Sequence, residues 1–294
     1  MKVGFIGIGR MGAAIAGRIL DAGHQIAVYN RTESKCADLV SRGATLAKSV
    51  ADAASFGDAV ITMVENDKAL YSVATGAGGI LQCLPRGSIH VAMGTYSVAL
   101  IGDLAEAHAT AGQVLVSAPV LGRPAVAAAG KLGILTGGPV EAVAKCRSLF
   151  EAAGRRTFDC GEKQVGAAVA KIANNLVLGC AVEAMAEGFV LAEKCGVTGA
   201  SFLEILTDGL FSAPAYEIYG KLIADKGYFD NPGFATTTAL KDFNLVLSAG
   251  ETAGVPLPAA GVCRDRLVSA IARGHGEADW SVMADEQARA SSLS

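Results

Sequence analysis

Short apolar runs alternate with helical patterns in the first half of the chain. Ala-rich segments with helical spacing, such as Met11–Ala22 and Val98–Ala111, separate several of these runs. Strands that alternate with helices predict a mostly parallel sheet with helices on both faces, which is an α/β architecture. The predicted strands are Lys2–Ile6, Gln25–Tyr29, Ala59–Met63, Ser88–Met93, Gln113–Ser117 and Lys131–Thr136, with Arg155–Asp159 as a candidate last strand.

The pattern changes near residue 163, beyond which we predict no further strand. Long helical stretches follow instead, over Val165–Cys195, roughly Thr198–Leu206, Thr236–Ala253 and Pro258–Arg273. We therefore predict an α/β domain over residues 1–162 and an all-helical domain over residues 163–294, joined by one long interdomain helix. A length of 294 residues fits two domains. The polar tail Ala284–Ser294 is expected to fray.

Composition narrows the class of protein further. Hydrophobic residues make up 51% of the chain, charged residues 18%, and the mean hydropathy is +0.39, which excludes intrinsic disorder. The net charge is −3 and there is no basic stripe, so we expect no nucleic-acid partner. The most membrane-like stretch, Val165–Val182, contains a lysine and two asparagines that would be costly in lipid. We predict a buried helix of a soluble domain there and no membrane partner.

The cysteines and histidines carry no metal or disulfide pattern. Seven cysteines are scattered without a CxxC pair, as expected of small hydrophobic residues in a reducing cytoplasm, where we place the protein. Four histidines show no metal-ligand spacing, so we expect no metal.

A glycine-rich string, Gly7-Ile8-Gly9-Arg10-Met11-Gly12, follows the first predicted strand and opens a predicted helix. In this context G-x-G-x-x-G is the dinucleotide-binding pattern of a Rossmann domain. Gly7 allows the tight turn, Gly9 lets the backbone approach a pyrophosphate, and Gly12 permits close packing of helix on strand. The helix N-terminus, with Arg10 and Met11 in its first turn, would present free N–H groups to the phosphates.

The end of the second strand indicates which dinucleotide binds. NAD is usually held by an acidic residue at this position, but the chain reads Asn30-Arg31-Thr32. Arg31 is well placed to pair with a 2′-phosphate, and Thr32 can cap the next helix and bond the same phosphate. We predict NADP(H) in preference to NAD(H), with Asn30 as part of the site; the alternative is a solvated surface arginine.

One lysine stands out on the long helix. Lys171 is the only charged residue between Lys163 and Glu183, and Asn174 and Asn175 lie three and four residues further on, on the same helix face. Apolar surroundings are expected to lower the pKa of such a lysine, which suits a proton donor in carbonyl reduction. The alternative is a structural lysine that snorkels at the helix edge.

Over essentially its whole length the chain resembles the β-hydroxyacid dehydrogenase family, which includes 3-hydroxyisobutyrate dehydrogenases and glyoxylate/succinic semialdehyde reductases. The resemblance rests on several short strings taken together, whereas each alone is unspecific. They are Gly7–Gly12, Asn30-Arg31-Thr32, Thr62-Met63-Val64, Ala118-Pro119-Val120, Gly166–Asn175 with its K-x-x-x-N spacing, and Leu240-Lys241-Asp242.

The resemblance implies roles for individual residues. Lys171 would donate or accept the proton, and Asn175, with Asn174 beside it, would orient the substrate. Met63, Val64 and Thr95 would line the cofactor cleft, and Lys241 would reach the cofactor or substrate, with Phe234 and Asp242 near the cleft. Strand-end, core and surface ion-pair roles remain alternatives for these supporting residues. The resemblance also implies a homodimer or homotetramer formed through the helical domain.

The chain departs from the family in one loop. Where relatives usually read Ser-Gly-Gly after Ala-Pro-Val, this chain reads Leu121-Gly122-Arg123-Pro124, which loses a hydroxyl and one backbone N–H. Arg123 could anchor a substrate carboxylate by a charge-assisted bond. Alternatively the pocket is less selective for anions, or Arg123 points to solvent.

The resulting hypothesis is an NADPH-dependent oxidoreductase that transfers hydride between nicotinamide and a small aldehyde, oxo acid or β-hydroxy acid. An imine reductase or reductive aminase on the same fold is the alternative, although retention of Lys171 favours carbonyl chemistry. A catalytically silent cofactor-binding protein is a third hypothesis, which intact Gly9, Lys171 and Asn175 disfavour.

Overall fold

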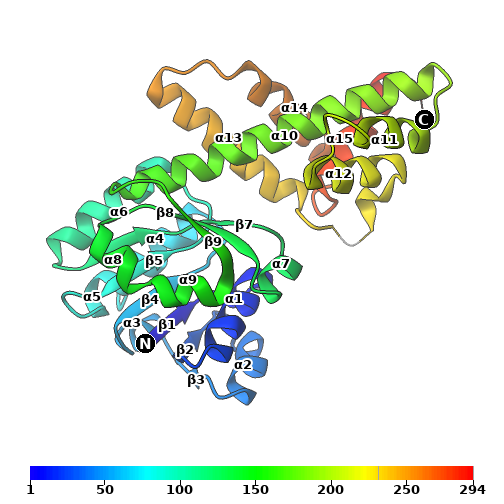
Figure 1. The fold of residues 1–294 in the computed structure, drawn as a ribbon. Helices are drawn as coiled ribbons and strands as arrows, with labels where there is room; N and C mark the ends of the chain where they lie inside the picture. The colour runs from blue at the N-terminus through cyan, green and yellow to red at the C-terminus, as the bar shows by residue number, and fades with distance from the viewer. Residues whose placement is uncertain (231, 294) are drawn as a thin grey trace. The chain divides into compact units, whose positions relative to one another are not determined.

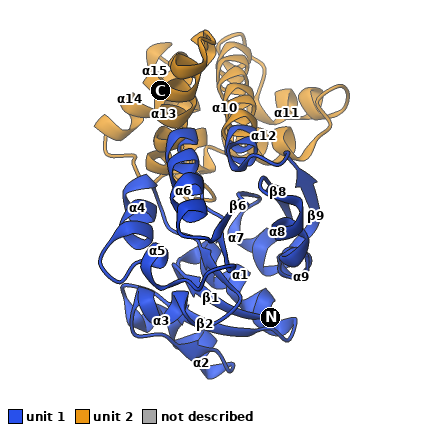
Figure 2. Ribbon diagram, turned by 90° about the vertical axis from the view of Figure 1, so that its left-hand side faces the viewer, with its two compact units in different colours: residues 1–171 blue, residues 172–294 orange. Residues whose placement is uncertain are grey.

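A computed structural model describes residues 1–230 and 232–293. The chain divides into two compact units, Met1–Lys171 (unit 1) and Ile172–Ser294 (unit 2), coloured separately in Figure 2. The division falls inside a long helix, whereas the sequence pattern changes just before that helix begins.

Unit 1 is built on a six-stranded sheet of order β3-β2-β1-β4-β5-β6, in which every neighbouring pair is parallel (Figure 1). The sheet confirms the predicted α/β fold, and its strands lie within one residue of the predicted bounds, except for the unpredicted two-residue β3. The strands are β1 (Lys2–Ile6), β2 (Gln25–Tyr29), β3 (Thr45–Leu46), β4 (Ala59–Thr62), β5 (Ile89–Ala92) and β6 (Val114–Ser117).

Helices cover both faces of this sheet because alternate strand residues point to opposite sides. Val3 and Phe5 pack in one cluster with α1 (Arg10–Asp21), α2 (Ala37–Ser41), α7 (Pro124–Ala128) and α9 (Arg147–Ala153). Ile6 packs on the opposite face with α3 (Val50–Ala54) and α5 (Ile80–Cys83). On that face α4 (Asp67–Thr75) and α6 (Val98–Thr110) cover the β5–β6 side. The smaller elements are η1 (Glu33–Cys36) and α8 (Val140–Lys145).

Two of the predicted strands belong to a second, three-stranded sheet. It consists of β7 (Val120–Leu121), β8 (Leu132–Thr136) and β9 (Gly154–Asp159), with β7 antiparallel and β9 parallel to β8. Pro119 lacks an N–H and stands where the chain leaves the first sheet. A single antiparallel bridge, Ser117 to Gly137, links the end of β6 to the residue after β8.

Unit 2 contains no named strand among its described residues, as predicted. Helix α12 lies outside the predicted helices, because its interior Gly220 weakens the helical signal. The elements are α10 (Gln164–Lys194, which begins in unit 1), α11 (Gly199–Thr207), α12 (Pro214–Ala224), η2 (Gly227–Phe229), α13 (Thr236–Ala253), α14 (Pro258–Ala272), η3 (Trp280–Val282) and α15 (Met283–Ala290).

The prediction of a buried helix over Val165–Val182 is wrong for most of that stretch, which belongs to α10. By length and composition α10 could cross a membrane, and only 33% of its most hydropathic window is buried within the chain. Val177 and Leu191 are 70% and 67% exposed. The sequence shows how apolar a helix is, but which sides are covered depends on partners that are far away in the chain.

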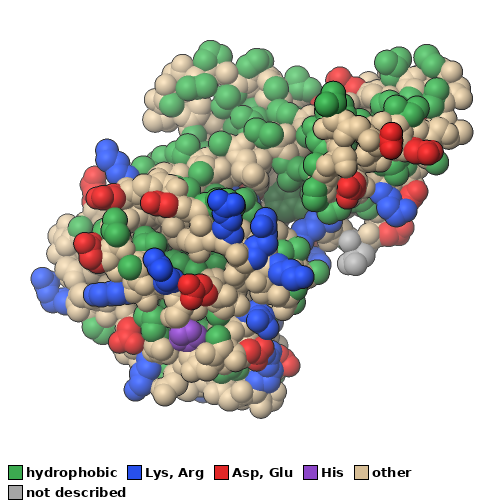
Figure 3. Space-filling model, in the orientation of Figure 1, with side chains coloured by type: hydrophobic (Ala, Val, Ile, Leu, Met, Phe, Trp, Pro, Cys, Tyr) green, Lys and Arg blue, Asp and Glu red, His purple; other side chains and the backbone are tan. Residues whose placement is uncertain are grey.

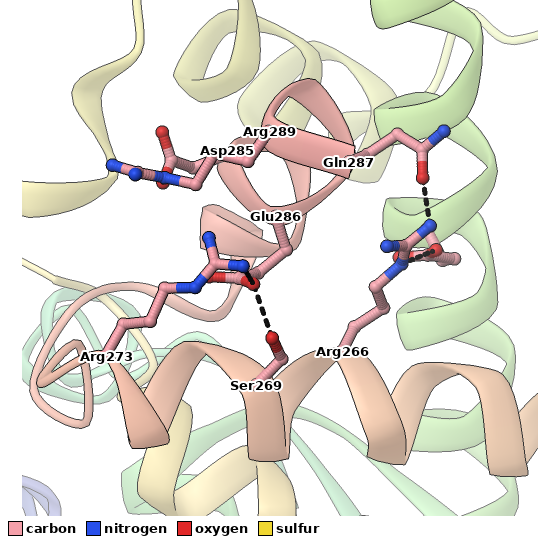
Figure 4. A network of polar contacts seen from close by, with 8 residues as sticks. Arg266, Ser269, Arg273, Asp285, Glu286, Gln287 and Arg289 are labelled. Atoms are coloured by element: carbon pink, nitrogen blue, oxygen red, sulfur yellow. Dashed lines mark hydrogen bonds and ion pairs between the residues drawn. The ribbon is translucent and has the colours of Figure 1, made fainter. Parts of the chain in front are cut away.

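The predicted fraying of the C-terminal tail is also wrong, because residues 283–290 form α15, whereas Ser294 lies outside the described residues. Glu286 is 2% exposed and accepts a hydrogen bond of 2.6 Å from the Ser269 hydroxyl, and its Oε2 lies 3.1 Å from Arg273 Nη2 (Figure 4). Arg266 bonds Gln287 and Glu183, the latter at 2.9 Å. These contacts hold α15 on α14 and α10.

The buried histidines of unit 1 predict that acid destabilises the fold. His90 and His108 are fully buried, and burial lowers the pKa of both below the ordinary 6.5. Below pH 6.5 the unfolded chain therefore binds protons that the folded chain excludes, so the free energy of unfolding decreases as pH falls. We expect a lower urea midpoint at pH 5.5 than at pH 7.5. His275 lies outside the pair, so His275→Gln should leave the difference between the two urea midpoints unchanged, whereas His108→Gln should reduce it. An equal difference in both variants would contradict the assignment of this pH dependence to the buried histidines.

Candidate functional site

At the glycine turn between β1 and α1, backbone atoms of different segments lie in close contact. Gly7 has φ +103°, and a Cβ there would lie 2.3 Å from the Met63 carbonyl oxygen. A Cβ on Gly12 would lie 1.9 Å from the Gly7 carbonyl oxygen. Neither position can hold a side chain, so the structure has the tight turn and the close helix–strand packing predicted for these glycines.

Gly9 differs from its two neighbours in the motif. A Cβ on Gly9 would meet no atom within 4 Å, and the residue lines a cavity. It is the N-cap of α1 and makes no side-chain capping bond, so its neighbouring helix start presents backbone N–H groups toward the open space. Open space beside these N–H groups fits the close approach of a pyrophosphate.

The cavity has a volume of about 820 Å³ and is formed by unit 1 at the carboxyl ends of β1, β2 and β4. This volume suits a cofactor, and the carboxyl ends of parallel strands are where doubly wound sheets bind ligands. Seven of the predicted cofactor residues line it: Gly7, Gly9, Asn30, Arg31, Thr32, Met63 and Val64. Arg10, Met11, Gly12 and Thr95 are not in its wall, and Lys241 belongs to unit 2.

Asn30 braces the turn. Its Oδ1 accepts a hydrogen bond of 3.0 Å from the Ile8 N–H, and its Nδ2 donates to the Thr32 carbonyl oxygen at 2.9 Å. Thr32 stands at the N-cap of η1, but its side chain makes no capping bond, so the predicted capping role is wrong. One amide therefore ties the glycine turn to the segment that holds Arg31.

The cavity wall also contains two cations that sequence reasoning missed. Lys35 follows Arg31 by four residues in η1, and Lys68 comes from α4. The only sequence signal for Lys35 is this short spacing from Arg31, and Lys68 has none, because α4 reaches the cavity only through the fold.

The ends of β4 and β5 are joined by one hydroxyl. Tyr96 Oη accepts a hydrogen bond from the Val64 N–H at 3.2 Å and donates to the Val64 carbonyl oxygen at 3.0 Å. Thr95, which precedes it, is half-buried in the same loop. The Tyr96 hydroxyl therefore holds both the N–H and the carbonyl oxygen of Val64, a residue of the cavity wall.

Helix α10 places Asn175 inward and Asn174 outward, with half-buried Lys171 one turn before Asn175. Asn175 is 6% exposed and donates through Nδ2 to Asp242 Oδ2 at 2.6 Å. Asp242 is itself 2% exposed, and its Oδ1 lies 3.0 Å from the Lys241 ammonium. Asp242 is therefore a buried partner of Asn175 rather than a surface ion-pair residue.

A glycine lets these two helices of unit 2 come close. A Cβ on Gly179, one turn after Asn175, would lie 2.4 Å from the Phe243 ring of α13. Phe243 follows Asp242 directly, so this close packing brings the carboxylate of α13 to the amide of α10. Phe234 is half-buried with its ring centroid 5.0 Å from that of Trp280, and Asp279 accepts the Phe234 N–H at 3.1 Å.

The divergent loop of unit 1 follows β7. Leu121 pairs with Gly133 of β8, and Gly122 has φ +142°, a conformation that favours glycine. Arg123 is the N-cap of α7 and is half-buried, with its Nη2 shielded from solvent. Arg123 is therefore neither buried nor fully exposed.

The described residues contain no group of three or more His, Cys, Asp or Glu side chains that could hold a metal ion. The size of the cavity, its glycine turn and its cations fit a dinucleotide.

Two family models together match most of the chain. The NAD-binding domain of 6-phosphogluconate dehydrogenase matches residues 2–161, and the NAD-binding region of NADP-dependent 3-hydroxyisobutyrate dehydrogenase matches residues 166–286. With the Rossmann sheet and the glycine turn, these matches define an NAD(P)-dependent oxidoreductase.

Similar proteins cover nearly the whole chain. It is 40% identical to the oxidoreductase YfjR of Bacillus subtilis over 96% of this chain and 98% of that protein. It is 31% identical to glyoxylate/succinic semialdehyde reductase 1 of Arabidopsis thaliana, over 96% and 97% respectively. The 3-hydroxyisobutyrate dehydrogenase structure from Mycobacterium tuberculosis is 25% identical, with a TM-score of 0.88 over 97% of this chain and 98% of that one. The chain belongs to the β-hydroxyacid dehydrogenase family, whose members act on CH–OH groups.

Imine reductases share the fold at a greater distance. The Streptomyces aurantiacus imine reductase is 23% identical, with a TM-score of 0.66 over 96% of this chain and 98% of that one. This likeness extends to the fold alone.

Proposed function

We propose that this protein is an NADPH-dependent reductase of small aldehydes or oxo acids, which also oxidises the corresponding β-hydroxy acids. The cavity beside Gly9 and Arg31 carries the proposal, because it combines a phosphate-accessible helix start with cations where the ribose of a dinucleotide lies in this fold. An imine reductase remains the second candidate, favoured only by the divergent loop at Leu121–Arg123.

The preference for NADP(H) rests on charge. Arg31 and Lys35 line the same cavity, and no acidic residue takes the place of Asn30-Arg31-Thr32 at the end of β2. A 2′-phosphate would bring two negative charges to this side of the cavity, where a guanidinium can bind it through two parallel hydrogen bonds.

Lys171 is the proposed proton donor. Bound nicotinamide supplies or accepts the hydride, and the alkoxide that forms needs a proton from a positioned acid. Asn175 lies one turn further along α10, and its amide is fixed by Asp242, so it can orient a substrate oxygen with little loss of side-chain entropy. We assign Phe234 to the substrate wall and Lys241 to the cofactor or the substrate.

Arg123 is the proposed anchor of a substrate carboxylate. It follows Gly122, where the backbone itself can approach a ligand, and its guanidinium is partly withdrawn from water. A charge-assisted bond gains strength in such surroundings, and it would replace the hydroxyl lost at Leu121.

We also propose a cytoplasmic homodimer or homotetramer with no nucleic-acid or membrane partner. All seven cysteines are free thiols, as suits a reducing compartment. Figure 3 shows hydrophobic side chains gathered over unit 2 on the face in view. The exposed apolar residues of unit 2 include Val177, Leu191, Ile205, Leu210 and Ile218, which a second copy of the chain would cover.

Replacing the arginine tests the cofactor preference. Arg31→Ala should raise the KM for NADPH by about ten- to a hundredfold, the loss of a charged hydrogen bond, while the KM for NADH stays unchanged. Lys145→Ala, which removes an exposed cation of unit 1 outside the cavity, is the matched control. A wild-type preference for NADH would overturn the assignment.

Replacing the lysine tests the reaction. Lys171→Met keeps the length of the side chain and should lower kcat/KM by about 10²- to 10⁴-fold, as expected for a lost general acid, without weakening NADPH binding. Lys194→Met, at the exposed end of the same helix, should be neutral. Oxidation of NADPH is followed with glyoxylate, succinic semialdehyde, methylmalonate semialdehyde, neutral aldehydes and a cyclic imine. Turnover of the imine alone would favour the second candidate, and full activity of Lys171→Met would refute the role of Lys171.

The carboxylate anchor is tested by comparing two substrates. Arg123→Ala should raise the KM for glyoxylate by about tenfold or more and leave the KM for a neutral aldehyde nearly unchanged, because only the oxo acid loses an ionic contact. Arg123→Lys keeps the positive charge but not the planar guanidinium, so its KM for glyoxylate should lie between those of the wild type and of Arg123→Ala. An equal loss for both substrates, or no loss, rejects the anchor.

A further inference from the structure

Four buried polar side chains form a hydrogen-bonded line across unit 1, on the face of the sheet covered by α6. Gln113 Oε1 lies 2.7 Å from His108 Nδ1, and His108 Nε2 lies 2.9 Å from His90 Nδ1. His90 Nε2 lies 2.9 Å from Thr62 Oγ1. All four residues are at most 5% exposed. The line begins just before β6 and reaches the carboxyl end of β4, which is the cavity side of the sheet.

The backbone fixes the direction of every hydrogen bond in this line. Gln113 Nε2 donates to the Leu84 carbonyl oxygen at 2.6 Å and to the Leu81 carbonyl oxygen at 3.3 Å, so its Oε1 must be the acceptor. His108 therefore donates from Nδ1 and accepts at Nε2.

His90 must then donate from Nδ1 and accept at Nε2, which commits the Thr62 hydroxyl proton to His90. The assignment needs both imidazoles neutral, and burial lowers the pKa of both, His90 most strongly with His108 adding to the effect. Reversing any one bond would leave two donors or two acceptors facing each other in the core.

The line continues to the cavity wall through Tyr96. With its proton given to His90, Thr62 Oγ1 can only accept, so the single Tyr96 hydroxyl proton is shared between Thr62 Oγ1 and the Val64 carbonyl oxygen, while Tyr96 Oη accepts from the Val64 N–H. Burial raises the pKa of Tyr96, so the hydroxyl stays protonated. A Cβ on Gly94 would lie 2.3 Å from Tyr96 Oη, so a glycine keeps the space that this hydroxyl occupies.

We propose that Gln113, His108, His90 and Thr62 are positioning residues for the cofactor site, which hold the Tyr96 hydroxyl and through it the Val64 backbone at the cavity wall. None of the four lines the cavity, so they would act only through Tyr96 and Val64. The inference rests on the proposed function, because it requires that this cavity hold the dinucleotide.

The test removes one hydroxyl and measures cofactor binding. Thr62→Val has nearly the same shape and should raise the Kd for NADPH, measured by fluorescence titration, about three- to tenfold, as expected for one lost hydrogen bond. Thr62→Ser restores the hydroxyl and should restore the Kd. Thr136→Val is the matched control, because it removes another buried threonine hydroxyl of unit 1, which bonds the Phe158 carbonyl oxygen away from the line.

A double variant separates positioning from general stability. Tyr96→Phe should weaken NADPH binding by a similar factor, and Thr62→Val combined with Tyr96→Phe should lose no more than the larger single effect. If Thr62→Val does not fold, Tyr96→Phe and Gly94→Ala, which displaces the same hydroxyl, are compared with Thr136→Val. Weakening no greater than that of Thr136→Val, or fully additive losses, overturns the proposal. A wild-type protein that binds neither NADPH nor NADH overturns the proposed function itself.

Discussion

The contact between Gly7, Gly12 and Met63 is the constraint on which unit 1 depends. Three backbone segments, the end of β1, the first turn of α1 and the residue after β4, meet at distances that exclude any Cβ at the two glycines. The approach fixes where α1 starts and, with it, the direction of its first N–H groups. Because no side chain fills this place, the cavity beside it opens directly onto backbone.

Several buried polar side chains are held in hydrogen-bonded pairs and lines. Asn175 meets Asp242, Glu286 meets Ser269 and Arg273, and the histidines stand between a threonine and a glutamine. A buried polar group costs free energy unless it is hydrogen-bonded, so each of these arrangements is stable only in the geometry that keeps its hydrogen bonds. With only 18% charged residues, such bonds supply directionality that a core of alanine and valine cannot.

A feature of the fold or of the candidate site can be predicted from the sequence when the residues that decide it are close together in the chain. The strands of the main sheet follow from the pattern of apolar residues, and the glycine turn follows from a string of six residues, because each is decided within a few positions of the chain. Lys35 and Lys68 lie at the cavity only because of the fold, and Asp242 bonds Asn175 although 67 positions separate them in the chain. The exposed side of α10 and the anchored α15 depend on what packs against them, which periodicity does not show. Tyr96 gave no signal, since a lone aromatic after a strand is usually core.

The pairing of Asp242 bears on how Asn175 is held on α10. A carboxylate fixes the Asn175 amide more firmly than a neutral acceptor would. The Lys241 ammonium lies 3.0 Å from Asp242 Oδ1, so the carboxylate is already balanced by a cation on its own helix. Asn175 therefore has a rigid partner whose charge is paired with a neighbouring ammonium. The pair therefore fixes a polar side chain inside an otherwise apolar core without leaving an unbalanced charge there.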